Sequence, residues 1–170
     1  MIREYADFLS LKGCLTLSGP LQVAFSSDIT DLEPLINLTS VTGADEQGNS
    51  IYLYKNENLE NIRGLRNLKC RLKGALVVDN NDKLVSLEGL EGIRTIGQNS
   101  ATDGIYIVSN PLLEDINALK NLAEPPMGNL RMWGNPALTE QARNSWHNMD
   151  THYNTYEDRT QSPDPRFNAH

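Results

Sequence analysis

Residues that build catalytic and metal sites are scarce in this sequence. It contains three histidines and two cysteines in 170 residues, and His147, His152 and His170 all lie near the C-terminal end. Their spacing does not place two ligands on one face of a helix, and no cysteine–histidine pattern of a zinc site occurs. The polar run from Asp79 to Asp82 lacks the acid pattern of a calcium loop. We therefore expect no metal, no cofactor and no catalytic activity.

An excess of basic residues and long apolar runs are absent as well. The net charge is −7, whereas a nucleic-acid-binding protein should show a basic stripe, so we expect no nucleic acid as partner. No stretch approaches the ~18 continuous apolar residues of a membrane span, and we expect no membrane insertion. Residues 1–13 show no continuous apolar segment of a secretion signal. This is compatible with a chain that is never secreted and with one that begins after a cleaved signal.

One pattern occurs five times along the chain. Each copy has two apolar residues two positions apart and a break residue five positions after the first. In all but the last copy, a run of aliphatic residues recurring every three positions follows. The clearest copy has Ile51 and Leu53, then Asn56, then Leu59 and its successors Ile62, Leu65 and Leu68. The five break residues are Ser26, Asn56, Asn81, Asn110 and Asn135.

Alternation before each break is the period of a β-strand, and asparagine favours a turn. Self-similarity at a period of about 20–50 residues is typical of a solenoid, in which neighbouring coils bury one another's apolar side. We therefore predict a mostly β solenoid of about five coils with short capping helices at both ends. Asn56, Asn81, Asn110 and Asn135 are expected to bond backbone amides within the stack, which is a structural role.

The flanking segments divide the chain into three parts. Residues 1–12 are predicted to form an N-terminal capping helix, and residues 13–150 the solenoid with a C-terminal capping helix. Thr139 is the expected N-cap of that second helix, and Trp146 its apolar cover for the last coil. Residues 151–170 are polar and without period, so we expect a tail. The apolar side of the first helix is expected to consist of Ile2, Tyr5, Phe8 and Leu9.

Side chains between the core positions of each strand should point outward and line up in rows. One row is Gln22, Tyr52, Val77, Tyr106 and Arg131, and the next is Ala24, Tyr54, Asp79, Val108 and Trp133. Aromatic residues and arginine are enriched in protein-binding sites. We therefore predict a ligand-binding face formed by Tyr52, Tyr54, Val77, Asp79, Tyr106, Val108, Arg131 and Trp133. Two other interpretations remain open: these residues only stabilise the sheet as cross-strand pairs, or the C-terminal tail covers them.

The motifs resemble the receptor L domain, the right-handed β-helical, leucine-rich ligand-binding module of epidermal-growth-factor and insulin receptors. Cys14 followed by Gly19-Pro20-Leu21-Gln22-Val23 is similar to the opening strand of the family. The repeated strand, asparagine and aliphatic run are similar to its coils, and Asn135-Pro136-Ala137-Leu138 before a helix is similar to its C-terminal end. The resemblance covers about residues 13–147, although Thr139 stands where the family has a cysteine. It implies a right-handed β-helix, a ligand-binding sheet face, and an extracellular or cell-surface location.

The function we predict is non-catalytic recognition of a protein or a glycan through this exposed, aromatic-bearing sheet face. The alternative is a structural or assembly subunit, or an intracellular leucine-rich scaffold, that uses the same face for self-association. Cys14 and Cys70 are either two buried thiols or a disulfide formed in an oxidising compartment. Asn37-Leu38-Thr39 is the single glycosylation sequon, and a glycan there would indicate secretion.

Overall fold

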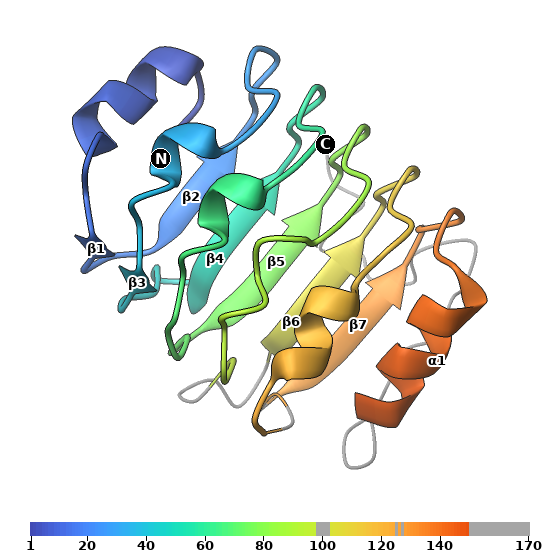
Figure 1. Ribbon diagram of the computed structural model, residues 1–170. Coiled ribbons are helices and arrows are strands. Elements are labelled where there is room, and N and C mark those ends of the chain that lie inside the picture. The colour runs from blue at the N-terminus through green and yellow to red at the C-terminus, as the bar shows by residue number, and fades with distance from the viewer. Residues whose placement is uncertain (98–102, 125, 127, 150–170) are drawn as a thin grey trace.

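Five parallel strands form one sheet along the length of the protein in the computed structural model, which describes residues 1–97, 103–124, 126 and 128–149 (Figure 1). The strands lie in chain order: β2 (Leu21–Ala24), β4 (Asn49–Tyr54), β5 (Ala75–Asp79), β6 (Asp103–Val108) and β7 (Asn129–Trp133). Every pair of neighbouring strands is parallel, so after each strand the chain returns to the end of the sheet at which that strand began. The predicted mostly β solenoid is therefore confirmed, with about four turns.

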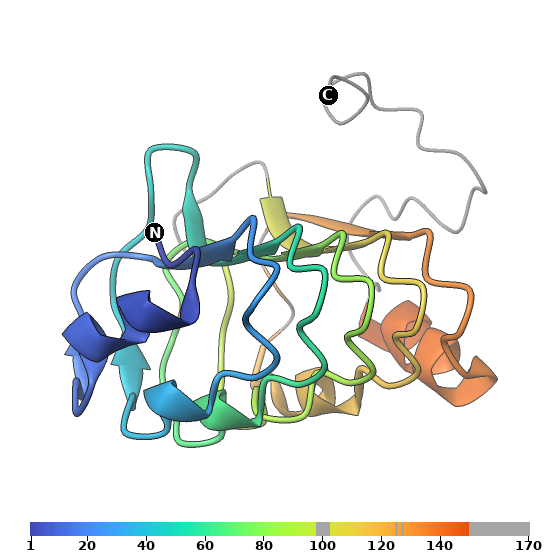
Figure 2. The same ribbon diagram turned by 90° about the horizontal axis from the view of Figure 1, so that it is seen from above.

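Short 3-10 helices form the side of the coils that lies away from the sheet, as Figure 2 shows. They are η2 (Glu33–Leu35), η3 (Arg63–Leu65) and η4 (Asn117–Asn121). A 3-10 helix has three residues per turn, which explains why the aliphatic residues of each copy recur every three positions. In the second copy, Leu59, Ile62, Leu65 and Leu68 are all fully buried.

A polar side chain two positions before the start of each such turn accepts a hydrogen bond from the first backbone amide of the turn. Asp31 Oδ1 accepts a hydrogen bond from the Glu33 amide at 2.8 Å, and Asp115 Oδ1 accepts one from the Asn117 amide at 2.8 Å. Asn61 and Ser86 accept the corresponding bonds in the two coils between them. These four residues form a second polar repeat, which the sequence analysis did not single out.

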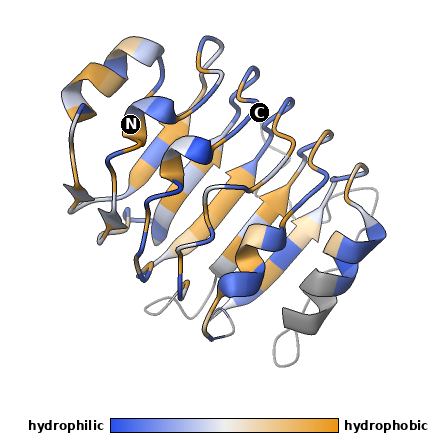
Figure 3. Cartoon of the chain, viewed as in Figure 1, coloured by the Kyte–Doolittle hydropathy of each residue, from blue (hydrophilic) through white to orange (hydrophobic). Residues whose placement is uncertain are grey.

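The aliphatic side chains of all coils form one continuous core, visible as the hydrophobic colour that runs along the strands in Figure 3. It begins at Ile2 and Phe8 and ends at Leu138 and Ala142. Fully burying one such side chain contributes about 1.5–3 kcal/mol. A second two-stranded sheet, β1 (Thr16–Leu17) with β3 (Ser40–Val41), extends the first coil.

The N-terminal segment differs from the expected helix in two respects. It forms a 3-10 helix, η1 (Tyr5–Leu11), on which Phe8 is buried and Leu11 packs on the core, while Tyr5 and Leu9 are exposed. A period of three brings Phe8 and Leu11 to the same side, which excludes Leu9 from it. Ile2 does not belong to the helix, because it pairs with Val23 as a short parallel bridge beside β2.

The C-terminal helix α1 (Glu140–Met149) begins after Thr139, whose Oγ1 accepts a hydrogen bond from the Ala142 amide at 3.2 Å. Thr139 is therefore the N-cap, as predicted. The side chains of Trp146 and His147 lie outside the described residues, as does the tail predicted for residues 151–170. The division of the chain into three parts stays a prediction.

Candidate ligand-binding face

Asparagine side chains fix the end of each strand. The Asn56, Asn81, Asn110 and Asn135 side chains are buried, and each reaches the next through its carboxamide. Asn110, for example, donates from Nδ2 to the Val78 and Val108 carbonyls at 3.0 and 2.9 Å. Its Oδ1 accepts the Asn81 amide at 3.0 Å. The ladder satisfies backbone groups that the turn removes from the sheet, where burial without a partner is costly.

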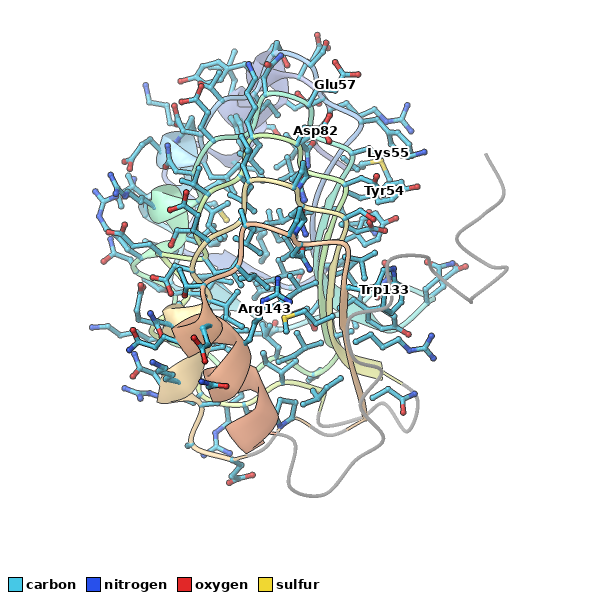
Figure 4. All side chains as sticks on the ribbon, turned by 90° about the vertical axis from the view of Figure 1, so that its right-hand side faces the viewer. Tyr54, Lys55, Glu57, Asp82, Trp133 and Arg143 are labelled. Atoms are coloured by element: carbon cyan, nitrogen blue, oxygen red, sulfur yellow. The ribbon has the colours of Figure 1, made fainter. Side chains whose placement is uncertain are left out.

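Different residues close the two ends of this ladder. At the N-terminal end Ser26 replaces asparagine, and its amide donates to Asn56 Oδ1 at 3.4 Å. At the other end Arg143 of α1 donates to the Asn135 and Leu138 carbonyls at 3.3 and 3.2 Å. Figure 4 shows Arg143 beside the last coil. The helix therefore supplies donors at the last coil that the structure describes.

The residue before each ladder position has a left-handed backbone. These residues and their φ angles are Phe25 (59°), Lys55 (51°), Asn80 (54°), Ser109 (53°) and Gly134 (70°). Hydrogen bonds to the next coil hold the conformation: the Phe25 amide donates to the Tyr54 carbonyl at 2.9 Å, and the Lys55 amide to the Asp79 carbonyl at 3.0 Å. Asparagine and glycine adopt this region readily, whereas a bulky residue there is an outlier. Phe25 and Lys55 are therefore two large side chains at a position that favours asparagine or glycine.

The register of the sheet places the outward residues in the two rows expected from the repeat. Gln22, Tyr52, Val77, Tyr106 and Arg131 are aligned in one row, and Ala24, Tyr54, Asp79, Val108 and Trp133 in the other. They belong to the side of the sheet opposite the main core, since Val77, Tyr106, Val108 and Trp133 form a separate cluster with Ala75. Figure 4 shows Tyr54, Lys55 and Trp133 on this outer side. We call it the outer face.

Much of the outer face is buried, which corrects the expectation that these residues are exposed. Tyr106 and Trp133 retain only 5% and 6% of their accessible surface, and Val77, Val108 and Asp79 are buried as well. Tyr106, Arg131 and Trp133 each have further interactions and are not free. The alternation within a strand determines the side on which a residue lies, but not what covers that side. The other interpretation, that the C-terminal tail covers this face, concerns residues 151–170, which lie outside the described part of the chain.

An accessible aromatic cluster remains over β2 and β4. Phe25 is 54% exposed, and its ring meets the Tyr54 ring edge-on with centroids 5.2 Å apart. Tyr52 lies 5.4 Å from Tyr54, and the Lys55 ammonium stands 5.2 Å from the Tyr54 centroid and 6.0 Å from that of Phe25. We call Phe25, Tyr52, Tyr54 and Lys55 the aromatic patch. Phe25 and Lys55 were not predicted to belong to the binding face. For Phe25, the signal in the sequence was an aromatic residue at a turn position.

Tyr52 of the aromatic patch and Asp79 next to the patch have shifted pKa values. Burial raises the pKa of Asp79 to about 6, against the smaller opposing effects of a hydrogen bond from Asn80 Nδ2 at 2.7 Å and of the nearby Lys55 charge. Burial also raises the pKa of Tyr52 to about 12, and the neighbouring Tyr54, Asp79 and Asp45 add to this effect. Both groups are neutral more readily than usual, because the outer face is poorly hydrated.

The described residues contain no constellation suited to another chemistry. Among them, no three His, Cys, Asp or Glu side chains come together as a metal site would require. Cys14 and Cys70 are free thiols, and burial raises the pKa of Cys70, which makes it less reactive. In the same part of the chain no helix has the length and apolar character needed to span a membrane.

A comparison with models of protein families agrees with this architecture. No curated protein and no solved structure matches the chain. The sequence model of one family, described as receptor L domain, matches residues 2–89, which include β1 to β5 and the whole aromatic patch. That family consists of non-catalytic ligand-binding modules that are typically extracellular and generally bind proteins. Since the match spans half of the sequence, this chain belongs to the receptor L domain family.

Proposed function

We propose that this protein recognises a protein ligand through the aromatic patch of its outer face. The observation that carries the proposal is the exposed side chain of Phe25, held in a left-handed backbone conformation next to two tyrosines and a lysine. The left-handed conformation recurs at the equivalent position of every coil, so what distinguishes Phe25 is a large apolar side chain that remains 54% exposed there. Large aromatic side chains supply much of the binding energy in protein interfaces.

The rigidity of the sheet supports the same proposal. Tyr52 and Tyr54 project from β4, a central strand bonded on both edges by β2 and β5. The cation–π contacts of Lys55 hold its long side chain against the rings. Fewer side-chain conformations are then lost when a ligand binds. The buried residues Val77, Tyr106, Val108 and Trp133 would support the patch from the neighbouring strands and would not contact the ligand directly.

The first test is the mass in solution by light scattering at two protein concentrations. A monomer of 19.0 kDa leaves the aromatic patch available for a different partner. A defined oligomer that Phe25→Ala dissociates would replace the proposal with self-assembly through the same patch. An oligomer that Phe25→Ala does not affect would place the contact elsewhere.

The second test is a binding screen of the purified protein on arrays of secreted proteins and of glycans. Phe25→Ala and Tyr54→Ala should each weaken binding to a protein hit at least tenfold while leaving the circular dichroism spectrum unchanged. Tyr5→Ala is the matched control, because Tyr5 is an aromatic residue of equal exposure, 52%, on the N-terminal helix. Equal losses for Tyr5 and Phe25 variants, or hits confined to the glycan array, would refute the proposal.

A further inference from the structure

One repeat position carries a side-chain amide that bonds to the preceding coil in the second and fourth coils. Position 67 of the second coil and position 121 of the fourth are asparagines whose Nδ2 donates to the preceding coil, to the Ile36 carbonyl at 2.8 Å and the Glu91 carbonyl at 3.3 Å. Gly92 is the equivalent residue of the third coil, where a Cβ would collide with the Leu68 carbonyl of the coil before. The position therefore faces the preceding coil throughout the solenoid.

Asn37 is the same position in the first coil, where the N-terminal segment packs on the coil through η1 against η2 and β1 against β3. Its side chain is exposed, and its carboxamide has no hydrogen bond to any residue that the structure describes. The glycosylation sequon Asn37-Leu38-Thr39 falls on this copy alone. In the second and fourth coils the residue two positions later is Lys69 or Ala123, so a sequon is missing where the amide is already bonded.

A groove lies next to this free amide. It has a volume of about 340 Å³ and runs between η1 and η2, and its lining includes Asn37, the charged Lys12 and Glu33, and the largely apolar Tyr5, Phe8, Leu9, Pro34 and Ile36. Leu9 is 74% exposed and Tyr5 52% exposed, so the groove has accessible apolar and aromatic surface. The C–H faces of a sugar pack well on an aromatic ring, and its hydroxyl groups provide a polar cover.

We propose that Asn37 is an N-glycosylation site and that the first sugars of its glycan cover the groove between η1 and η2. In the transfer step, Asn37 Nδ2 attacks C1 of an oligosaccharide carried on a polyprenyl diphosphate. The N–C bond forms while the C–O bond to the diphosphate breaks. The polyprenyl diphosphate leaves with the bonding electrons, and the nitrogen releases one proton. The glycan then covers the groove between η1 and η2 at the N-terminal end of the solenoid, and it blocks end-to-end association there.

The test is expression of the full chain behind a cleavable secretion signal in a eukaryotic cell. Glycan occupancy is measured by mass spectrometry on the secreted and the retained material, because transfer occurs on entry into the secretory pathway. We expect a mass above 19.0 kDa that returns to this value after glycosidase treatment, and that is absent in Asn37→Gln. Unmodified Asn37 in both fractions of the wild-type chain would overturn the proposal.

Two further measurements separate this site from a sequon that is modified by chance. Tyr5 should be nitrated at least threefold more slowly in the glycosylated chain than in Asn37→Gln, and equal rates would refute the covering of the groove. Lys69→Thr creates the equivalent sequon at Asn67, whose amide is bonded to Ile36. A glycan at Asn67 should lower secreted yield at least threefold, because it breaks that bond. Full occupancy of Asn67 with unchanged yield would show that the free amide of Asn37 is irrelevant.

Discussion

Replacing Asp79 by asparagine is expected to stabilise this protein at neutral pH. The Asp79 carboxyl is only 3% exposed, between Tyr54 and Val108 in the outer row. The one hydrogen bond that its carboxyl accepts from the described residues comes from Asn80 Nδ2. Burial dominates over this bond and over the Lys55 charge and raises the pKa from the ordinary 3.8 to about 6. Asparagine has the same shape, keeps an oxygen for Asn80, and removes the charge.

The sign and size of the effect follow from linkage between folding and protonation. Because the folded-state pKa is raised, the neutral carboxyl contributes stability in full below pH 3.8, and this is lost as the pH rises through about 6. Each pKa unit corresponds to about 1.4 kcal/mol, so ionised Asp79 costs about 3 kcal/mol above neutral pH. The Asp79→Asn variant should therefore exceed the wild type by about 3 kcal/mol near pH 8 and match it near pH 4.

Urea denaturation followed by circular dichroism, at intervals from about pH 4 to pH 8, measures both proteins. The control is Asp82→Asn, which removes one negative charge from an exposed residue of the same turn and should not produce this gain. The reasoning is refuted if Asp79→Asn is less stable than the wild type near pH 8, or if the difference between them is independent of pH.

Three other substitutions or titrations test the remaining structural claims. Asn110→Ala should lower the free energy of unfolding by about 3 kcal/mol in urea, because the buried Asn81 amide loses its acceptor; a loss below about 1 kcal/mol would contradict the ladder. Trp133→Ala should cost about 3–5 kcal/mol in the same assay, whereas Tyr54→Ala, on the accessible patch, should cost about 1 kcal/mol or less. Equal losses of stability in these two variants would show that the outer face is wrongly divided into a buried part with Trp133 and an accessible part with Tyr54. The Tyr52 phenol should titrate near pH 12, measured as the tyrosinate absorbance lost in Tyr52→Phe, and titration near its ordinary pKa of 10.0 would place this ring in water.

The repeat shows how far local pattern predicts this fold. Its constant offsets place Tyr52 beside Val77 and Val77 beside Tyr106, and the register confirms this alignment. The offsets suffice because parallel strands in a solenoid stack in register, so equal positions in the repeat become neighbours in space. The period of three in the aliphatic runs is also explained by the 3-10 turns. The choice of a 3-10 helix at residues 5–11 was not predictable, because apolar residues three and four apart both occur there.

By itself the sequence determined which residues lie inside the coils, which lie outside, and that an asparagine ends each strand of the repeat after the first. These properties depend on alternation and turn preference, which are local. Only the tertiary structure decided which outward residues are accessible. Trp133 and Tyr106 are buried while Phe25 is exposed, because accessibility depends on what packs above a residue and on the backbone angle at which it leaves the strand. For the same reason only the tertiary structure shows that the Asn37 carboxamide, unlike those of Asn67 and Asn121, bonds to no residue that the structure describes.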